Sequence, residues 1–163
     1  MPSNSFAIAD LYDAHADKLS VVEPMFNDYG GERTFSGPIS TVKAFEDNTF
    51  VRAALEEAGN GRVLVVDAGG SMRCAMVGDN LVQLGIDNGW AGIIVYGCIR
   101  DSLPIGEMAL GVKAMNTNPV KSLKQDRGDR DIAVTFGGVT FTPGEFVYAD
   151  PDGVAVSRAN LLG

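Results

Sequence analysis

Two uninterrupted aliphatic runs, separated by a predicted helix, constrain the fold of this chain more than any other feature. The runs are residues 62–67 (RVLVVD) and residues 92–96 (GIIVY). Such continuous apolar sequences are typical of strands that are buried on both faces. A helix is predicted between them over residues 81–88, with Asp79 or Asn80 as its cap. Units of this kind form parallel strand pairs with right-handed crossovers, so the sequence predicts an α/β centre.

The segments before this unit add further helix and strand. Helices are predicted over residues 8–18 and 48–58, and β structure over residues 34–44 with an interruption at Gly37-Pro38. Residues 27–31 are predicted to form a turn.

The C-terminal part is predicted to be antiparallel, because its short strands are separated by tight turns and close in a hairpin around residues 150–153. A helix is expected at 105–110, and strands at 111–116, 132–136, 139–141, 146–149 and 153–156. We therefore expect residues 1–163 to form one layered α/β domain, with a mixed sheet that has a parallel βαβ centre and antiparallel C-terminal strands.

Composition narrows the class of protein. The chain has 163 residues, of which 45% are hydrophobic and 21% charged, as in an ordinary globular domain. No apolar run reaches the roughly 18 residues of a membrane-spanning helix, and residues 1–10 lack the pattern of a signal peptide. Cys74 and Cys98 have neither disulfide nor zinc spacing, and two free thiols fit a reducing cytoplasm, where we expect the protein. The net charge of −8 disfavours direct binding of nucleic acid and favours a basic protein partner.

One candidate ligand site is the loop at residues 67–71 (DAGGS), which follows the first buried strand. Small residues at the carboxyl end of a strand let a ligand approach the backbone closely. The loop has neither a GxGxxG nor a GK[ST] motif, so a nucleotide is weakly indicated and a plain tight loop is the alternative.

A second candidate site combines the start of the predicted helix with the end of the following strand. Twenty residues separate Asp79 from Arg100-Asp101, and one helix and one strand fill that interval. Helix starts and strand ends lie on the same edge of a parallel sheet, where such sheets bind ligands. The helix N-terminus and Arg100 can each bind a carboxylate, and Asp101 offers a hard oxygen for Mg²⁺ or Mn²⁺. The alternative is a helix cap at Asp79 and a surface ion pair between Arg100 and Asp101.

A family resemblance runs through nearly the whole chain. The chain resembles the family of the regulator of ribonuclease E activity A, which includes the 4-hydroxy-4-methyl-2-oxoglutarate aldolases that also decarboxylate oxaloacetate. The resemblance is carried by VVEPMFNDYGG, RVLVVDAGGSMRCAMVGDN, NGWAGIIVYGCIRD and FGGVTFTPGEFVYADPDGVAVS. Its most specific part is the pattern formed by Asp79, Arg100 and Asp101.

The resemblance implies a layered β/β/α swivelling-domain fold and a ring-shaped homotrimer with sites near subunit boundaries. It implies a divalent metal, Mg²⁺ or Mn²⁺, at Asp101. It implies substrate contacts from Gly78, Asp79, Asn80, Leu81 and Arg100. The metal would act as a Lewis acid on a small 2-oxo acid, Arg100 would stabilise the developing pyruvate enolate, and Asp79 would remove the proton of the departing hydroxyl.

The main alternative is a non-catalytic regulator that binds ribonuclease E. Family members that act only as regulators tend to lose the Asp after the Arg, and this chain keeps it as Asp101. Other chemistries have less support: His15 is the only histidine, and Schiff-base lysines such as Lys43 or Lys113 would usually belong to a barrel of about 250 residues. Cys98 is expected to be a small buried residue.

Overall fold

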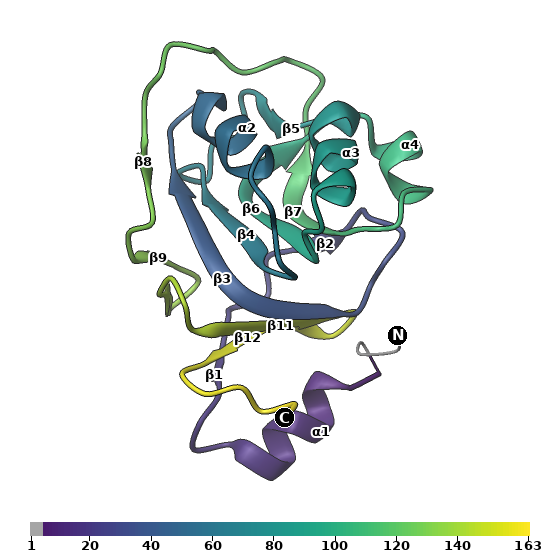
Figure 1. Cartoon of the computed structure of the whole chain (residues 1–163), viewed down its shortest axis with the longest axis vertical. Helices are drawn as coiled ribbons and strands as arrows, with labels where there is room; N and C mark the ends of the chain where they lie inside the picture. The colour runs from purple at the N-terminus through teal and green to yellow at the C-terminus, as the bar shows by residue number, and fades with distance from the viewer. Residues whose placement is uncertain (1–4) are drawn as a thin grey trace.

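The computed structural model describes residues 5–163, in which a curled mixed sheet separates three helices at one end of the molecule from α1 at the other (Figure 1). The helices are α1 (Ile8–His15), α2 (Thr49–Leu55), α3 (Asp79–Asp87) and α4 (Ser102–Gly106). The strands are β1 (Ser20–Val21), β2 (Asn27–Asp28), β3 (Phe35–Lys43), β4 (Val63–Asp67), β5 (Ala75–Val77), β6 (Gly92–Ile99), β7 (Gly111–Thr117), β8 (Asp129–Arg130), β9 (Val134–Phe136), β10 (Val139–Phe141), β11 (Phe146–Asp150) and β12 (Gly153–Ser157).

The predicted parallel centre is confirmed. Strands β3, β4, β6 and β7 lie side by side in that order and are parallel, and the order of the main sheet is β1-β12-β11-β3-β4-β6-β7-β2. Strands β11, β12 and β1 add an antiparallel edge, and the closing hairpin pairs Asp150 with Gly153 as predicted. A small β9–β10 hairpin forms a separate sheet.

Strand β3 joins the parallel and antiparallel parts of the sheet. Its first residues pair with β11 in antiparallel register, with Pro38 opposite Phe146, while Ile39 begins the parallel pairing with β4. The expected interruption at Gly37-Pro38 is therefore wrong, because the strand runs through both residues and changes partner there. Gly37 is required by a close approach, since a Cβ on it would lie 2.1 Å from the Gly61 carbonyl oxygen.

Two large apolar cores cover the two faces of the sheet. One lies between the sheet and helices α2, α3 and α4, and the other lies between the sheet and the strands of the C-terminal part. Helix α1 packs on the outer side of the β11–β12 hairpin, against Tyr148 and Ala155. This arrangement agrees with the expected β/β/α layering and leaves the carboxyl ends of the parallel strands at the end of the molecule that holds α2 and α3.

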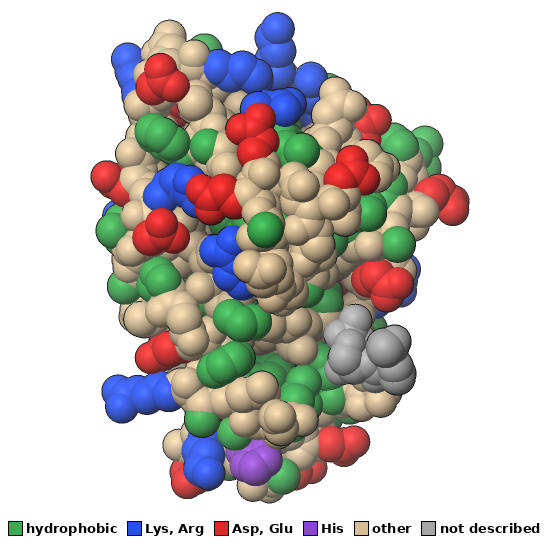
Figure 2. Space-filling model, in the orientation of Figure 1, with side chains coloured by type: hydrophobic (Ala, Val, Ile, Leu, Met, Phe, Trp, Pro, Cys, Tyr) green, Lys and Arg blue, Asp and Glu red, His purple; other side chains and the backbone are tan. Residues whose placement is uncertain are grey.

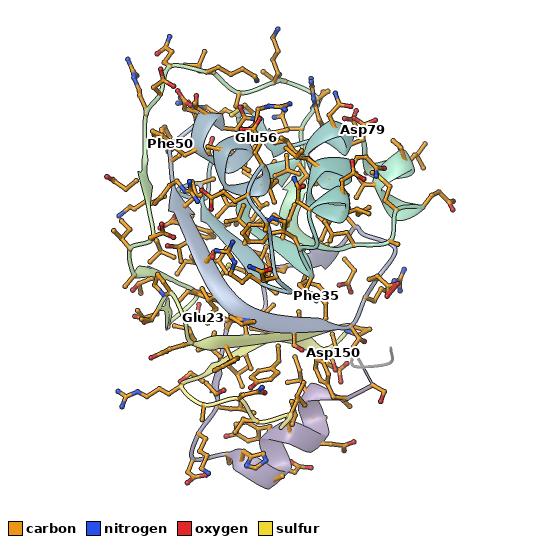
Figure 3. All side chains as sticks on the ribbon, in the orientation of Figure 1. Glu23, Phe35, Phe50, Glu56, Asp79 and Asp150 are labelled. Carbon is orange, nitrogen blue, oxygen red and sulfur yellow. The ribbon has the colours of Figure 1, made fainter. Side chains whose placement is uncertain are left out.

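The aromatic ring of Phe35, on β3, packs against two strands that are adjacent to each other, β6 and β7. A Cβ added to Gly92 would lie 2.3 Å from Cδ2 of Phe35, and one added to Gly111 would lie 2.1 Å from Cδ1 of the same ring. Phe35 is only 1% exposed (labelled in Figure 3). The ring therefore fills the space that two missing side chains leave on adjacent strands β6 and β7.

Several short elements differ from the sequence predictions. The helix expected at 105–110 occurs earlier, as α4, and residues 27–31 contribute β2, which pairs with β7, instead of only a turn. Strands β1, β5 and β8 were not predicted, because two or three residues carry too little periodicity to identify a strand. Within the described residues, none of the helices has the length and apolarity needed to cross a membrane.

Candidate functional site

The sequence-predicted residues converge at one cavity, at the end of the sheet where β6 finishes and α3 begins. The cavity has a volume of about 180 Å³. Its lining includes all the predicted site residues, Gly78, Asp79, Asn80, Leu81, Arg100 and Asp101, together with Asn48, Arg52, Ala75, Lys121, Ser122 and Lys124. Asp79 is labelled at this end of the molecule in Figure 3.

Asp101 connects the end of the strand to the start of the helix. It adopts the left-handed conformation (φ 59°, ψ 41°), which Asp tolerates better than most residues. One carboxylate oxygen, Oδ2, accepts a hydrogen bond from the Asp79 N–H at 3.1 Å. The expectation that the side chain of Asp79 or Asn80 caps this helix is wrong, because the cap position is Gly78 and no side chain there caps it.

Gly78 gives the Asp101 carboxylate room to reach the helix. Its backbone is extended, so no unusual dihedral angle requires glycine here. A Cβ at this position would, however, lie 2.7 Å from Oδ2 of Asp101 and 3.5 Å from Cγ of Arg100. The absence of a side chain at residue 78 therefore keeps the space around the carboxylate open.

The N-terminus of α3 keeps two donors for a ligand. The first four N–H groups of a helix have no partner inside it. Asp101 accepts the Asp79 N–H, and the first bond within the helix runs from the Val82 N–H to the carbonyl of Gly78 at 3.2 Å. The N–H groups of Asn80 and Leu81 remain available, in a position that favours an anion because of the helix dipole.

Arg100 lies beside these donors and is half-buried. Its backbone N–H donates to the carbonyl of Val77 at 2.9 Å, which fixes the end of β6 next to β5. One guanidinium nitrogen, Nη1, donates to the carbonyl of Pro119 at 3.3 Å. Within the described part of the chain the other guanidinium N–H groups have no partner, so they can bind a planar carboxylate through two hydrogen bonds.

Sequence reasoning missed five polar residues of the cavity. Asn48 is the residue before α2 and Arg52 lies in the last turn of that helix, whereas Lys121, Ser122 and Lys124 come from the loop after β7. No motif marks them, since they reach the cavity only through tertiary contacts. Figure 2 shows Lys and Arg side chains gathered at this end of the molecule, over α2 and the loop after β7.

The two carboxylates of the cavity fit a hard divalent cation of the magnesium type. Within residues 5–163, no group of three or more His, Cys, Asp and Glu side chains is placed to hold a metal. Mg²⁺ in proteins commonly uses one or two carboxylates and completes its shell with waters and substrate oxygens. Asp101 and the nearby Asp79 could supply the one or two carboxylate ligands of such an ion. Gly78 has no side chain, which leaves space beside the Asp101 carboxylate.

The first candidate site, residues 67–71, has the geometry of a tight loop. Oδ1 of Asp67 accepts the Gly69 N–H at 2.9 Å, so this carboxylate oxygen is used locally. Gly69 and Gly70 both have positive φ, at 69° and 71°. The loop borders an open hollow of about 330 Å³ that Lys43 also lines, separate from the residues that line the Asp101 cavity.

The other residues considered from the sequence lie outside the Asp101 cavity. His15 belongs to α1, on the far side of the sheet. Lys113 is buried and bonded to Asp28. Cys98 is 1% exposed, and burial raises the pKa of its thiol, as expected for a small core residue.

Comparison with known proteins adds independent information. The family model described as RraA-like, Aldolase/RraA, matches residues 8–156. A relative from Aromatoleum aromaticum with the provisional name 4-hydroxy-4-methyl-2-oxoglutarate aldolase is 62% identical over 157 residues, covering 96% of this chain and 99% of its own. A similarly named relative from Alkalilimnicola ehrlichii is 56% identical, covering 97% of this chain and 98% of its own.

Two solved structures have the same fold. One, described as an S-adenosylmethionine:2-dimethylmenaquinone methyltransferase from Geobacillus kaustophilus, has a TM-score of 0.95 and 54% identity, over 96% of this chain and 98% of its own. The other, described as the RNA-processing inhibitor RraA from Thermus thermophilis, has a TM-score of 0.91 and 38% identity, over 94% of this chain and 93% of its own.

Proposed function

Since this chain belongs to the RraA-like (Aldolase/RraA) family, we propose that it is a divalent-metal-dependent lyase that cleaves 4-hydroxy-4-methyl-2-oxoglutarate and decarboxylates oxaloacetate. The observation that carries the proposal is the single cavity in which Asp101, Asp79 and Arg100 meet the free N–H groups of α3. A regulator that works only by binding another protein has no need for this combination.

The head group of a 2-oxo acid fits the donors at this end of the sheet. Its carboxylate would accept hydrogen bonds from the N–H groups of Asn80 and Leu81, where the helix dipole favours negative charge. Arg100 would lie beside the 2-oxo oxygen, where negative charge grows as the substrate becomes an enolate. Asp101 would hold a magnesium or manganese ion, which supplies Lewis-acid stabilisation of that charge when it is bound.

Asp79 is the general base in this proposal. In aldol cleavage the C3–C4 bond breaks, its electron pair becomes part of the pyruvate enolate, and the C4 hydroxyl loses its proton as it becomes the keto group of a second pyruvate. Asp79 would accept that proton. Protonation of the enolate at C3 then gives pyruvate, so the overall reaction neither gains nor loses protons. Decarboxylation of oxaloacetate reaches the same enolate by loss of carbon dioxide.

The experiment that tests this function compares wild type with Asp101→Ala. We expect pyruvate release from oxaloacetate to require Mg²⁺ or Mn²⁺, to exceed the rate with metal alone, and to stop when a chelator is added. Asp101→Ala should abolish the metal-dependent rate, whereas Asp13→Ala, on the exposed surface of α1, should leave it unchanged. Full metal-dependent turnover by Asp101→Ala would refute the proposal.

The alternative function, inhibition of an RNA-processing enzyme, is supported by the Thermus relative and by a Streptomyces coelicolor structure described as an unusual RNase ES inhibitor, which is 30% identical. The net charge of −8 suits a basic segment of such an enzyme. Binding to ribonuclease E should then weaken as salt rises, because exposed charges are screened over about 8 Å at physiological ionic strength. Absence of binding at low salt would remove this alternative.

Methyl transfer, which the description of the Geobacillus structure suggests, is less compatible with the cavity. A menaquinone precursor is a largely apolar molecule, and apolar pockets bind such ligands. The cavity around Asp101 is instead lined by two carboxylates and four cationic side chains. A small charged substrate fits this lining better.

We also propose that the protein assembles as a homotrimer with the cavity near a subunit boundary. Exposed large apolar side chains lie on the segments beside the cavity, which is typical of surfaces that bind a partner: Phe45, Met72, Val120 and Leu123. Hydrogen bonds connect these segments. The Asn118 side chain donates to the Met72 carbonyl, and the Leu123 N–H donates to the Glu46 carbonyl. A monomer by light scattering at micromolar concentration would contradict this assembly.

A further inference from the structure

The cavity contains more positive charge than one carboxylate needs. Its cationic side chains are Arg52, Arg100, Lys121 and Lys124, and its acidic ones are Asp79 and Asp101. Among the residues that the structure describes, no carboxylate lies within 4.0 Å of any of these four cations, since the ion pairs found involve other residues. A chain with a net charge of −8 thus concentrates unpaired positive charge around one small hollow.

Arg52, Lys121 and Lys124 come from parts of the chain that make no contribution to the α3 N-terminus. Arg52 lies on α2, and the two lysines lie on the loop that follows β7. The loop is fixed at the cavity, because Ala75 forms a β-bridge with Lys121 and its N–H donates to the Val120 carbonyl at 2.7 Å.

The side chain of Lys124 is held by the beginning of α2. Its Nζ donates to Oδ1 of Asn48 at 3.3 Å, and Nδ2 of Asn48 donates to the carbonyl of Met76 at 3.1 Å. Met76 belongs to β5, the strand that ends directly before Gly78. This chain of contacts keeps an ammonium group near the predicted head-group donors without neutralising it.

Ser122 provides a second, independent sign of a ligand. It lies between the two lysines and lines the same cavity, and the residue is 6% exposed. Its Oγ has no hydrogen-bond partner among residues 5–163. Buried hydroxyl groups in proteins nearly always have a partner. Rotation of the Ser122 side chain toward the cavity would give this hydroxyl an acceptor, namely a carboxylate oxygen bound by the neighbouring lysines.

From these observations we propose that Arg52, Lys121 and Lys124 bind the second carboxylate of a 2-oxo diacid and so determine specificity for diacids over 2-oxo monoacids. The inference rests on the proposed function, since it assumes that α3 and Arg100 bind the head group. Four cations against Asp79 and Asp101 leave a formal excess of two positive charges. A bound divalent metal adds to that excess, so a dianion offsets more of the positive charge than a monoanion such as pyruvate does.

Calorimetric titration with two stable ligands tests the assignment. Pyruvate carries the head group alone, and 2-oxoglutarate carries the same head group with a distal carboxylate. In the presence of Mg²⁺, wild type should bind 2-oxoglutarate more tightly than pyruvate. Arg52→Gln and Lys124→Gln should each reduce that ratio on the order of tenfold, the usual effect of losing one hydrogen bond to a charged group. The dissociation constant of pyruvate should stay almost unchanged.

Arg33→Gln is the matched control. It removes the same charge from an exposed position that does not line the cavity, so it reports the effect of net charge alone and should leave the ratio unchanged. An unchanged ratio in both cavity variants, or equal binding of the two ligands by wild type, would overturn the assignment while leaving the proposed lyase in place. Failure of wild type to bind either ligand, together with no turnover, would overturn both.

Discussion

Asp101 has two structural roles, one for its backbone and one for its side chain. Its left-handed backbone turns the chain sharply at the end of β6, and its carboxylate accepts the first N–H of α3. That hydrogen bond uses one face of Oδ2 and leaves Oδ1 for another partner. The proposed function divides the two acids accordingly: Asp101 would hold the metal, and Asp79 would serve as the base.

Asp79→Asn should separate the two reactions. The substitution is nearly isosteric and removes the base while Asp101 remains. Cleavage of 4-hydroxy-4-methyl-2-oxoglutarate should fall by about 10²–10⁴-fold, the usual contribution of a general base. Decarboxylation of oxaloacetate should fall far less, because the departing carboxylate is already ionised. The measurement is the ratio of the two kcat values in wild type and variant, and an unchanged ratio would return Asp79 to a supporting role.

Arg100→Lys serves as the matched comparison for that experiment. Both reactions pass through the same enolate, and lysine keeps the charge but loses the planar fork of the guanidinium group. Both rates should therefore fall together. A selective loss of one rate would show that Arg100 contacts only one of the two substrates productively.

At the scale of elements, the site depends on the loop after β7 being held against α2. Asp47 contributes to this attachment: its Oδ1 accepts the Thr49 N–H at the start of α2 at 3.0 Å, and its Oδ2 accepts the Gln125 N–H of the loop at 2.6 Å. Burial raises the pKa of Asp47, but the hydrogen bonds from Thr49, Gln125 and Arg127 outweigh burial, so its pKa lies below the ordinary value of 3.8.

Asp47→Asn should destabilise the protein by about 1–3 kcal/mol at neutral pH, because an amide nitrogen cannot accept the hydrogen bonds that one carboxylate oxygen receives. A carboxylate with a lowered pKa contributes stability that is present above its unfolded pKa and is lost as the pH falls through its folded pKa. The difference between wild type and variant should accordingly shrink below about pH 4. Urea unfolding at fixed protein concentration measures it.

Asp126→Asn is the control for the Asp47 experiment, since Asp126 is exposed and lies on the same loop. Its free energy of unfolding should stay within about 0.5 kcal/mol of wild type. Equal losses in both variants would mean that the loop does not depend on the hydrogen bonds of Asp47.

The long elements could be predicted from the sequence, and the lining of the site only partly. The runs before Asp67 and Tyr96 predicted β4 and β6, and the spacing of Asp79 and Arg100 predicted their meeting, because helix starts and strand ends share one edge of a parallel sheet. Lys121 and Lys124 could not be predicted in the same way. They lie in a loop whose position is set by contacts with Asp47 and Ala75, far away in the sequence.

At the scale of the whole molecule, a buried lysine joins the β7–β2 edge of the sheet to strand β11 of the C-terminal hairpin. The Nζ of Lys113, on β7, lies 3.0 Å from Oδ1 of Asp28 on β2 and 2.7 Å from the carbonyl oxygen of Asp150 on β11. Oδ2 of Asp150 accepts the N–H of Ile8, the first residue of α1, at 2.8 Å. The helix-covered end is thereby linked to the end that carries α1, and Figure 3 labels Asp150 between them.

Lys113→Met should be strongly destabilising, by about 2–4 kcal/mol, because it leaves Asp28 without its partner in a largely dry environment. Adding Asp28→Asn to Lys113→Met should recover part of the loss. Hydrogen exchange should also show faster exchange in α1, since the anchor at Asp150 is weakened. If the double variant is no more stable than the single one, the pair is not the source of the effect.

The ring of Phe35, which fills the gaps left by Gly92 and Gly111, restricts the order in which mutations can accumulate in this lineage. If a residue with a side chain first replaces Gly92 or Gly111, its Cβ clashes with the Phe35 ring, and β6 or β7 must distort. A chain that first exchanges Phe35 for a smaller residue only opens a cavity, which costs stability but keeps the sheet intact. Natural sequences should therefore reach a larger residue at 92 or 111 by way of a smaller residue at 35, and the reverse route should be closed.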